Sequence, residues 1–241
     1  MSRAGGHGPG HDAETAIGIR RWALMTVAFT AVMAGVLFGT AGTFDWGGAW
    51  WYLALIAGNQ ILLAALLFRR NPALLAERSE VRAGAKSWDA PLAAAIAIVG
   101  PLTMAIISGL DVRYNWIGYV PPEIVLRYLL VAVAGSLLAT WAMAVNAYFS
   151  GVVRIQDDRQ HRVVTSGPYR AIRHPGYLGA VLVTIATPYI LGSQWAVFVA
   201  PVVVVVIILR TWLEDRTLLA ELGGYREYAQ RVKYRLVPGI W

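Results

Sequence analysis

The chain has 241 residues and a net charge of +7, and 57% of its residues are hydrophobic whereas only 15% are charged. A soluble domain is about 25% charged, so this chain has too few charged residues to cover the surface of a soluble protein. It contains no cysteine, which excludes disulfides, thiolate nucleophiles and cysteine-ligated metal centres. The composition therefore indicates a membrane protein.

Five segments without a charged residue are long enough to cross a membrane as helices, which takes about 20 apolar residues. They are residues 22–44, 46–68, 90–110, 128–153 and 175–209. The last segment contains Pro188 and the turn-forming residues 192–194, so we expect a hairpin of two short helices there. The predicted fold class is all-α: a polytopic helical membrane protein with about six spans, the last two forming a helical hairpin.

The basic residues predict the orientation of these spans. Of the 21 basic residues, all except Arg113 and Arg127 fall on one side of the membrane in this topology. Basic loops are retained in the cytoplasm, so both termini and the loop at 154–174 are expected there. Frequent Ala, Val and Arg suggest a prokaryotic source. We therefore expect a multi-pass protein of the prokaryotic cell (inner) membrane, with its site facing the cytoplasm.

The chain divides into three predicted regions. Residues 1–16 are rich in glycine and polar residues, which predicts a disordered cytoplasmic tail. Residues 17–139 hold the N-terminal transmembrane helices. Residues 140–241 form a core that consists of a cytoplasmic loop, the hairpin and a C-terminal segment. In that segment apolar residues recur at steps of three and four, which predicts cytoplasmic interfacial helices, interrupted at Gly223-Gly224.

Several residues inside the predicted spans suggest contacts between helices. Gly35 and Gly39 have the spacing that lets two helices approach closely, and packing within the monomer is favoured over dimerisation. Asn59, Gln60 and Asn146 would be costly in a membrane unless paired. We therefore expect hydrogen bonds between helices at these positions, with a substrate contact as the alternative.

The segment 154–177 carries the densest set of residues suited to chemistry. It contains His161 and His174 together with five arginines, two tyrosines, two prolines and two glycines. Pro175 marks the first turn of a helix, where free amides beside basic residues favour an anionic group. A retained basic loop is the alternative, but it leaves the prolines, tyrosines and histidines unexplained.

Arg210 and Glu214 form a second group, at the cytoplasmic end of the last span. They lie four residues apart and therefore share one helix face. A snorkelling arginine with a nearby counter-ion is one interpretation. The predicted topology places this pair at the same membrane level as His174 and Tyr177, which favours a composite site.

Together these residues resemble the isoprenylcysteine carboxyl methyltransferase family, integral-membrane enzymes that use S-adenosylmethionine. The resemblance covers residues 140–241, which would then be a methyltransferase core. The elements that carry it are Gln156 followed by His161-x-Val163-Val164, the block Gly167-Pro168-Tyr169-x-x-x-Arg173-His174-Pro175-x-Tyr177-x-Gly179, Arg210 with Glu214-Asp215, and Leu222-Gly223 with Tyr225 and Tyr228.

The resemblance implies a site for S-adenosylmethionine and for a lipophilic or small-molecule methyl acceptor, with contact to membrane lipid and without a metal or a nucleic acid. The implied donor-binding residues are Gln156, His161, Arg162, Val163, Val164, Tyr169, His174, Pro175, Gly176, Tyr177 and Glu214. Arg210, assisted by Arg173, is implied to act in catalysis by binding a carboxylate of the acceptor.

The acceptor atom determines which further groups the reaction needs. An ionised carboxylate needs no general base, and Arg210 would orient it through two parallel hydrogen bonds. An amine or a thiol would need its proton removed, and His161 and His174 are the obvious bases. An isoprenylcysteine carboxylate, a phospholipid amine, a small thiol and an isoprenoid all remain open as acceptors, and so does the oligomeric state.

Two other functions remain open. Membrane reductases of the sterol or steroid type also carry an Arg-His-Pro-x-Tyr block and bind a nicotinamide cofactor. Here Gly176 and Gly179-Ala180 stand where those enzymes tend to have Asn and Gly-Glu, which favours the methyltransferase. A non-catalytic protein whose basic loops bind anionic lipid is the second alternative, and it leaves the tyrosines, the histidines and Glu214 unexplained.

Overall fold

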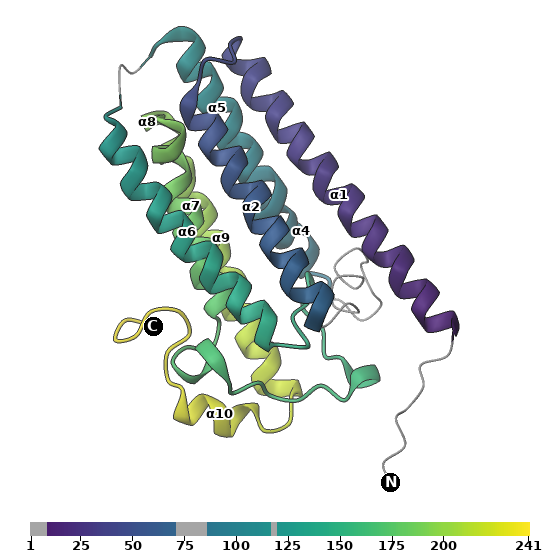
Figure 1. Cartoon of the computed structure of the whole chain (residues 1–241). Helices are drawn as coiled ribbons and strands as arrows, with labels where there is room; N and C mark the ends of the chain where they lie inside the picture. The colour runs from purple at the N-terminus through teal and green to yellow at the C-terminus, as the bar shows by residue number, and fades with distance from the viewer. Residues whose placement is uncertain (1–8, 71–85, 117–119) are drawn as a thin grey trace.

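The computed structural model describes residues 9–70, 86–116 and 120–241. Within these ranges the chain is helical and has no strand, which confirms the all-α prediction. The elements in chain order are α1 (Pro9–Ala41), α2 (Gly47–Arg70), α4 (Asp89–Ala94), the π-helix η1 (Ala95–Val99), α5 (Gly100–Tyr114), α6 (Pro122–Val145), the 3₁₀ turns η2 (Asp157–Arg159) and η3 (Gly167–Arg170), α7 (Pro175–Leu191), α8 (Gln194–Val197), α9 (Val199–Glu221) and α10 (Tyr225–Arg231). The long helices form a bundle, and α10 lies at one end of it (Figure 1).

The protein is a multi-pass membrane protein. Five helices among the described residues are long and apolar enough to cross a membrane, and α7 is a shorter apolar helix. The five are Thr15–Ala41, Gly47–Phe68, Asp89–Tyr114, Pro122–Val145 and Gln194–Glu221. The beginning of α1 and the C-terminus lie at the same end of the bundle (Figure 1). This arrangement suits an even number of crossings, and six crossings remain a prediction.

The turn between α7 and α9 has the residues that a reversal of the chain requires. Pro188 lies in the last turn of α7, and Gly192 adopts a φ of 73° that favours glycine. The hydroxyl of Ser193 then accepts a hydrogen bond from the Ala196 amide (3.2 Å), which caps α8. The apolar segment 175–209 therefore forms the predicted hairpin.

Helices α6 and α7 approach each other closely because both have a glycine at their contact. A Cβ added at Gly135 would lie 2.7 Å from the carbonyl oxygen of Gly179, and one added at Gly179 would clash with the Gly135 carbonyl. Above this contact the rings of Tyr128 and Tyr189 stack with centroids 3.8 Å apart. The contact fixes α7, the helix whose first turn faces the site described below.

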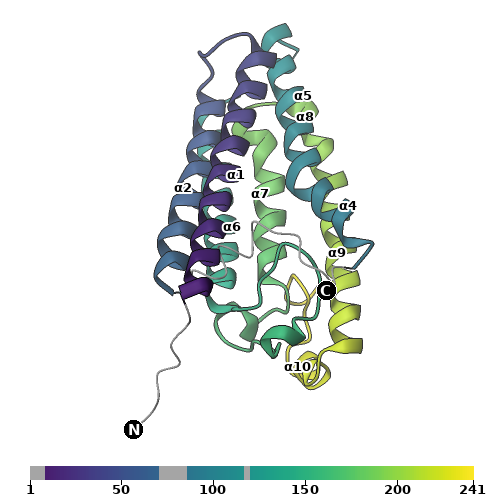
Figure 2. The same cartoon turned by 90° about the vertical axis from the view of Figure 1, so that its right-hand side faces the viewer.

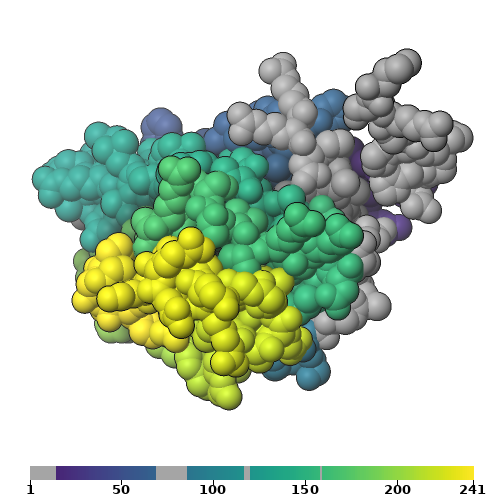
Figure 3. Space-filling model, turned by 90° about the horizontal axis from the view of Figure 1, so that it is seen from below, coloured from purple at the N-terminus to yellow at the C-terminus, as the bar shows by residue number. Residues whose placement is uncertain are grey.

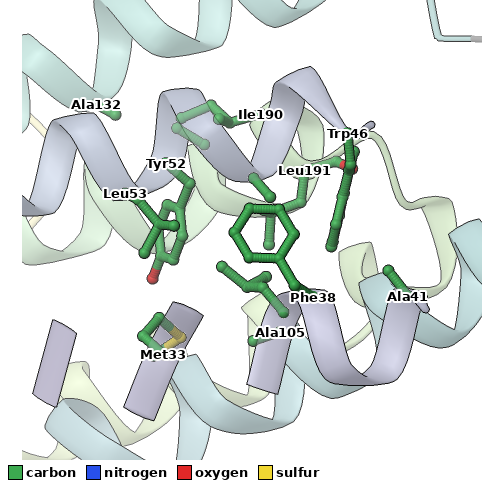
Figure 4. Packing of buried hydrophobic residues seen from close by; sticks show 13 residues of the cluster. Met33, Phe38, Ala41, Trp46, Tyr52, Leu53, Ala105, Ala132, Ile190 and Leu191 are labelled. Carbon is green, nitrogen blue, oxygen red and sulfur yellow. The ribbon is translucent and has the colours of Figure 1, made fainter. Parts of the chain in front are cut away.

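The main hydrophobic core lies in the half of the bundle away from α10. Phe38 of α1, Tyr52 of α2 and Ile190 of α7 belong to this one cluster (Figure 4). The indole of Trp46 also donates a hydrogen bond to the carbonyl of Leu191 (3.1 Å). The core therefore joins the N-terminal helices to the hairpin and leaves the opposite end free for a polar site.

Asn59 makes a hydrogen bond between helices as expected, but the two glycines of α1 do not pack against another described helix. Thr140 of α6 donates a hydrogen bond to the side-chain oxygen of Asn59 in α2 (3.1 Å). The prediction for Gly35 and Gly39 is wrong, because both are exposed and an added Cβ would meet no described atom within 4 Å. Both glycines are exposed on α1, so no other helix among the described residues uses the space they leave.

The two ends of the chain differ in how well the sequence predicts them. Residues 1–16 were predicted to be disordered, but helix α1 begins at Pro9, so residues 9–16 are helical. Residues 1–8 of the predicted tail lie outside the described residues. Proline in the first turn, followed by Asp12 and Glu14, favours a helix start. At the other end, α9 stops at Glu221, Gly224 adopts a φ of 80° and α10 follows, so the break lies where predicted.

We expect Gly179→Val to destabilise the protein by about 1–3 kcal/mol, because the new side chain would force α6 and α7 apart. Gly35→Val is the matched control, since it adds the same side chain at an exposed glycine of another helix. Thermal unfolding in detergent measures both variants. Equal midpoints for the two variants would contradict the close contact of α6 and α7.

Candidate active site

One cavity lies at the end of the bundle where α7 begins and α9 ends. It encloses about 900 Å³ of empty space, including the part that opens to solvent. Among its lining residues are Gln156, His161, Arg162, Val163, Val164, Tyr169, Arg173, His174, Gly176, Tyr177, Arg210 and Glu214. Figure 3 shows this end of the molecule, where the yellow C-terminal segment lies beside the green loop that follows α6. All site residues predicted from the sequence, except Pro175, therefore line one cavity.

Asp215 of α9 holds together the chain segments around this cavity. Its carboxylate is fully buried and lies 3.1 Å from Nη1 of Arg173 and 3.2 Å from Nε2 of His174. It also accepts hydrogen bonds from the hydroxyl of Tyr225 (2.9 Å) and from Nε of Arg235 (2.8 Å). A buried carboxylate is tolerated only with such partners. Asp215 thus ties α9 to the start of α7, to α10 and to the C-terminal segment.

Glu214, the neighbour of Asp215, is the carboxylate that reaches the cavity. Its side chain is 25% exposed and accepts a hydrogen bond of 2.5 Å from the Tyr177 hydroxyl. Nδ1 of His174 lies 3.9 Å from the Glu214 carboxylate, while Nε2 of the same ring faces Asp215. Glu214 is therefore oriented by a tyrosine and still accessible to a ligand.

Arg210 does not pair with Glu214, one helical turn away, but with Asp89. Its Nε and Nη2 atoms donate to the two carboxylate oxygens of Asp89 at 2.7 and 3.1 Å. Nη2 also donates to the carbonyl of Gly151 (2.8 Å). This finding corrects the expectation that Arg210 offers two parallel hydrogen bonds to an acceptor, because Asp89 already occupies that edge of the guanidinium.

The loop that follows α6 contributes one wall of the cavity. The Gln156 side chain is almost fully buried, and its amide donates to the Tyr148 carbonyl (2.7 Å) and accepts from Arg159 (3.0 Å). The His161 ring packs against Tyr148, with centroids 4.5 Å apart. Burial, together with the nearby Arg154, lowers the pKa of His161 below its ordinary value. The lowered pKa favours the neutral form of His161, and the hydrogen bonds of the Gln156 side chain fix the shape of the loop.

Tyr169 forms the floor of the cavity with two partners distant in sequence. Its hydroxyl accepts a hydrogen bond from the Asn146 amide (3.1 Å), and its carbonyl accepts one from the Tyr228 hydroxyl (2.7 Å). Burial raises the pKa of both tyrosines well above the usual value, so both hydroxyls stay protonated. The tyrosines supply neutral, aromatic surface.

The first turn of α7 is less open to an anion than the sequence suggested. The amides of Arg173 and His174 donate to the carbonyls of Tyr234 (2.9 Å) and Arg235 (3.0 Å) in the C-terminal segment. Pro175 has no amide hydrogen and is buried behind the cavity wall. Gly176, whose added Cβ would lie 2.9 Å from the Phe149 ring, is the residue of this turn that lines the cavity together with Tyr177.

Sequence reasoning missed several residues of the site. Asp89 was overlooked although an acidic residue at the start of an apolar segment, on the basic side of the membrane, is a recognisable signal. Asp215 and Tyr225 were noted only as part of a motif, without a role. Tyr148 and Arg235 carried no signal, because their contacts arise from the path of the loop and of the C-terminal segment.

Comparisons with known proteins show what this chain is similar to. The family model described as "Isoprenylcysteine carboxyl methyltransferase (ICMT) family" matches residues 127–220. A relative from Oryza sativa subsp. indica, "Probable protein-S-isoprenylcysteine O-methyltransferase", is 27% identical over 194 residues, which are 76% of this chain and 93% of the relative. Over residues 127–220 the chain is similar to the isoprenylcysteine carboxyl methyltransferase family. It is accordingly a membrane methyltransferase, and the comparisons do not support the reductase or the purely lipid-binding alternative.

Two further comparisons extend this result. "Protein-S-isoprenylcysteine O-methyltransferase B" of Arabidopsis thaliana is 27% identical over 111 residues, 43% of this chain and 54% of the relative. The solved structure of the eukaryotic intramembrane Ras methyltransferase of the same family aligns with a TM-score of 0.56 at 18% identity and covers 89% of this chain and 75% of that chain. At this identity the alignment shows a shared fold, and it extends across most of the helices outside residues 127–220.

We expect Asp215→Asn to lower the stability by on the order of 3 kcal/mol, because it removes the charge that compensates the buried Arg173. Glu221→Gln is the matched control: it removes an exposed ion pair with Lys86 (2.7 Å) near the end of the same helix, which is worth at most about 1 kcal/mol. Thermal unfolding measures both effects. Equal losses would show that Asp215 does not hold this end of the protein together.

Proposed function

We propose that this protein binds S-adenosylmethionine in the cavity and transfers its methyl group to the carboxylate of a lipophilic acceptor of the S-isoprenylcysteine type. The observation that carries the proposal is the convergence of the family motif residues from the loop, α7 and α9 on one cavity. The names of the plant relatives supply the acceptor class.

The residues of the cavity suit the chemical groups of S-adenosylmethionine. Glu214 can accept hydrogen bonds from the donor's ammonium group or ribose hydroxyls. Nε of Arg173 is buried without a hydrogen-bond partner among the described residues, and together with His174 it suits the donor's carboxylate. The aromatic faces of Tyr169 and Tyr177 suit the positively charged sulfonium. These cavity residues therefore fit S-adenosylmethionine. The described residues contain no cluster of side chains that could hold a metal ion.

Arg210 lies where this cavity meets the apolar part of the protein. It is the first charged residue of α9, after a long uncharged stretch, and its guanidinium lies over the Tyr177 ring at 5.5 Å from the centroid. A lipophilic acceptor can keep its apolar chain at membrane depth while its carboxylate approaches Arg210 from within the cavity. The methyl donor would be bound on the other side of Tyr177, near Glu214.

In this reaction the protein side chains position the two reactants and do not have to transfer a proton. Bound S-adenosylmethionine supplies a methyl group on a positively charged sulfur, the electrophile of the reaction. A carboxylate acceptor is ionised at neutral pH, so no side chain has to remove a proton. The cavity holds the two partners in line, and such positioning supplies up to about 7–11 kcal/mol in well-oriented systems. His161 stays neutral and contributes to the wall.

We further propose that the cavity faces the cytoplasm of a prokaryotic cell, with residues 140–241 as the catalytic core and residues 17–139 as its membrane scaffold. The distribution of basic residues supports this orientation, and the C-terminus and the beginning of α1 lie at the same end of the bundle (Figure 1). Reporter fusions within residues 192–194 and after residue 241 should therefore report opposite sides of the membrane.

The proposed function predicts that the purified protein binds S-adenosylmethionine and methylates N-acetyl-S-farnesylcysteine to a base-labile ester. Glu214→Gln should weaken donor binding by about 1–3 kcal/mol, the cost of a lost charge-assisted hydrogen bond. Glu227→Gln is the matched control, since Glu227 is exposed on α10 and does not line the cavity. Titration calorimetry measures donor affinity. Binding of NADPH without binding of S-adenosylmethionine would reject the proposal.

A further inference from the structure

Asp89 connects the N-terminal half of the chain to the proposed acceptor site. It is the first residue of α4, is fully buried, and lies outside the segment 127–220 that the family model matches. Its carboxylate receives Nε and Nη2 of Arg210 (2.7 and 3.1 Å) and the backbone amide of Val153 (2.8 Å). Figure 2 shows α4 beside α9. Asp89 thus fixes both the arginine and the loop that borders the cavity.

The hydrogens of the Arg210 guanidinium can be counted individually. A guanidinium has five N–H groups, one on Nε and two on each terminal nitrogen. Asp89 accepts from Nε and from Nη2, and the Gly151 carbonyl accepts from Nη2 (2.8 Å). The two edges that could hold a carboxylate through two parallel bonds are Nε with Nη2 and Nη1 with Nη2, and Nη2 is occupied in both cases. Nη1, which makes no hydrogen bond to a described residue, is the terminal nitrogen left for a ligand.

We propose that Asp89 is a positioning residue that, together with the Gly151 carbonyl, blocks two-point binding at Arg210, so that Nη1 holds one oxygen of the acceptor carboxylate and the other oxygen stays free to react. This inference rests on the proposed function, since it assumes a carboxylate acceptor. It assigns a role in acceptor binding to a residue of the membrane scaffold.

The chemistry of the reaction explains why such a block is useful. In the transfer, the free carboxylate oxygen forms a bond to the methyl carbon with its own electron pair. The bond between that carbon and sulfur breaks, its electron pair goes to sulfur, and no proton moves. A two-point grip on the carboxylate would engage both oxygens and stabilise the anion more than the transition state, in which its charge is being lost. Asp89 also neutralises the charge of Arg210, which further weakens the binding of the unreacted acceptor carboxylate.

The test is Asp89→Asn in the full-length protein, with N-acetyl-S-farnesylcysteine as acceptor. The asparagine keeps the size of the side chain but accepts fewer hydrogen bonds from Arg210 and leaves its charge uncompensated. We expect KM for the acceptor to fall and kcat to fall by about tenfold, because stronger ground-state binding raises the barrier to transfer. The affinity for S-adenosylhomocysteine should stay unchanged, and it also reports folding. Lys86→Gln is the matched control, since it removes an exposed ion pair between the same two parts of the chain.

A second variant keeps the inference testable if Asp89→Asn does not fold. Arg210→Lys retains an ion pair with Asp89 but removes the free Nη1 group. We expect a higher KM for the carboxylate acceptor, unchanged competition by the uncharged amide of the same prenylcysteine, and unchanged affinity for S-adenosylhomocysteine. Wild-type kinetics in this variant would overturn the inference.

The possible outcomes separate the inference from the proposed function. If the wild type methylates the carboxylate, and Asp89→Asn raises KM or leaves both kinetic constants unchanged, the inference alone is wrong and Asp89 is structural. If the wild type methylates an amine or a thiol and no carboxylate, the proposed acceptor and the inference are both wrong. If KM and kcat both fall in Asp89→Asn and neither falls in Lys86→Gln, the result supports both the inference and the proposed function.

Discussion

The geometry of the site depends on one buried carboxylate, Asp215. A charged group without contact to water is stable only when cations and hydrogen-bond donors surround it. Arg173, His174, Tyr225 and Arg235 provide this environment, and they come from three separate parts of the chain. Because no single segment can satisfy Asp215, the loop, α10 and the C-terminal segment have to converge on the end of α9. The cavity is the space that these segments enclose.

The charged side chains at the two ends of the cavity differ in how far they are already paired, and this difference suits two different ligands. At the Asp215 end, Glu214 remains 25% exposed and offers acceptor oxygens to a cationic or hydroxylated ligand. At the other end, Arg210 is neutralised by Asp89 and offers a limited donor surface to an anion. Tyr177 lies between them and contacts both, through its hydroxyl to Glu214 and through its ring to Arg210. A donor and an acceptor of opposite charge can therefore meet across one tyrosine.

The sequence allowed the fold class and most of the cavity to be predicted. Uncharged segments and turn residues such as Pro188 and Gly192 predict the helices and the hairpin, because both signals are local. The ion pair between Asp89 and Arg210 was not predictable, since it depends on how α4 packs against α9. Arg210 was instead expected to face a ligand directly. The failure at Gly35 and Gly39 has the same origin: spacing shows that a close contact is possible, whereas only the packed bundle shows which face is used.

The most direct test of this account is a structure of the protein determined with bound S-adenosylhomocysteine. The account predicts that the nucleoside lies in the cavity beside Glu214 and Tyr177, with Asp215 still bound to its four side chains and Arg210 still paired with Asp89. A nucleoside bound elsewhere on the protein, or a cavity that the loop after α6 fills completely, would contradict the assignment of the site.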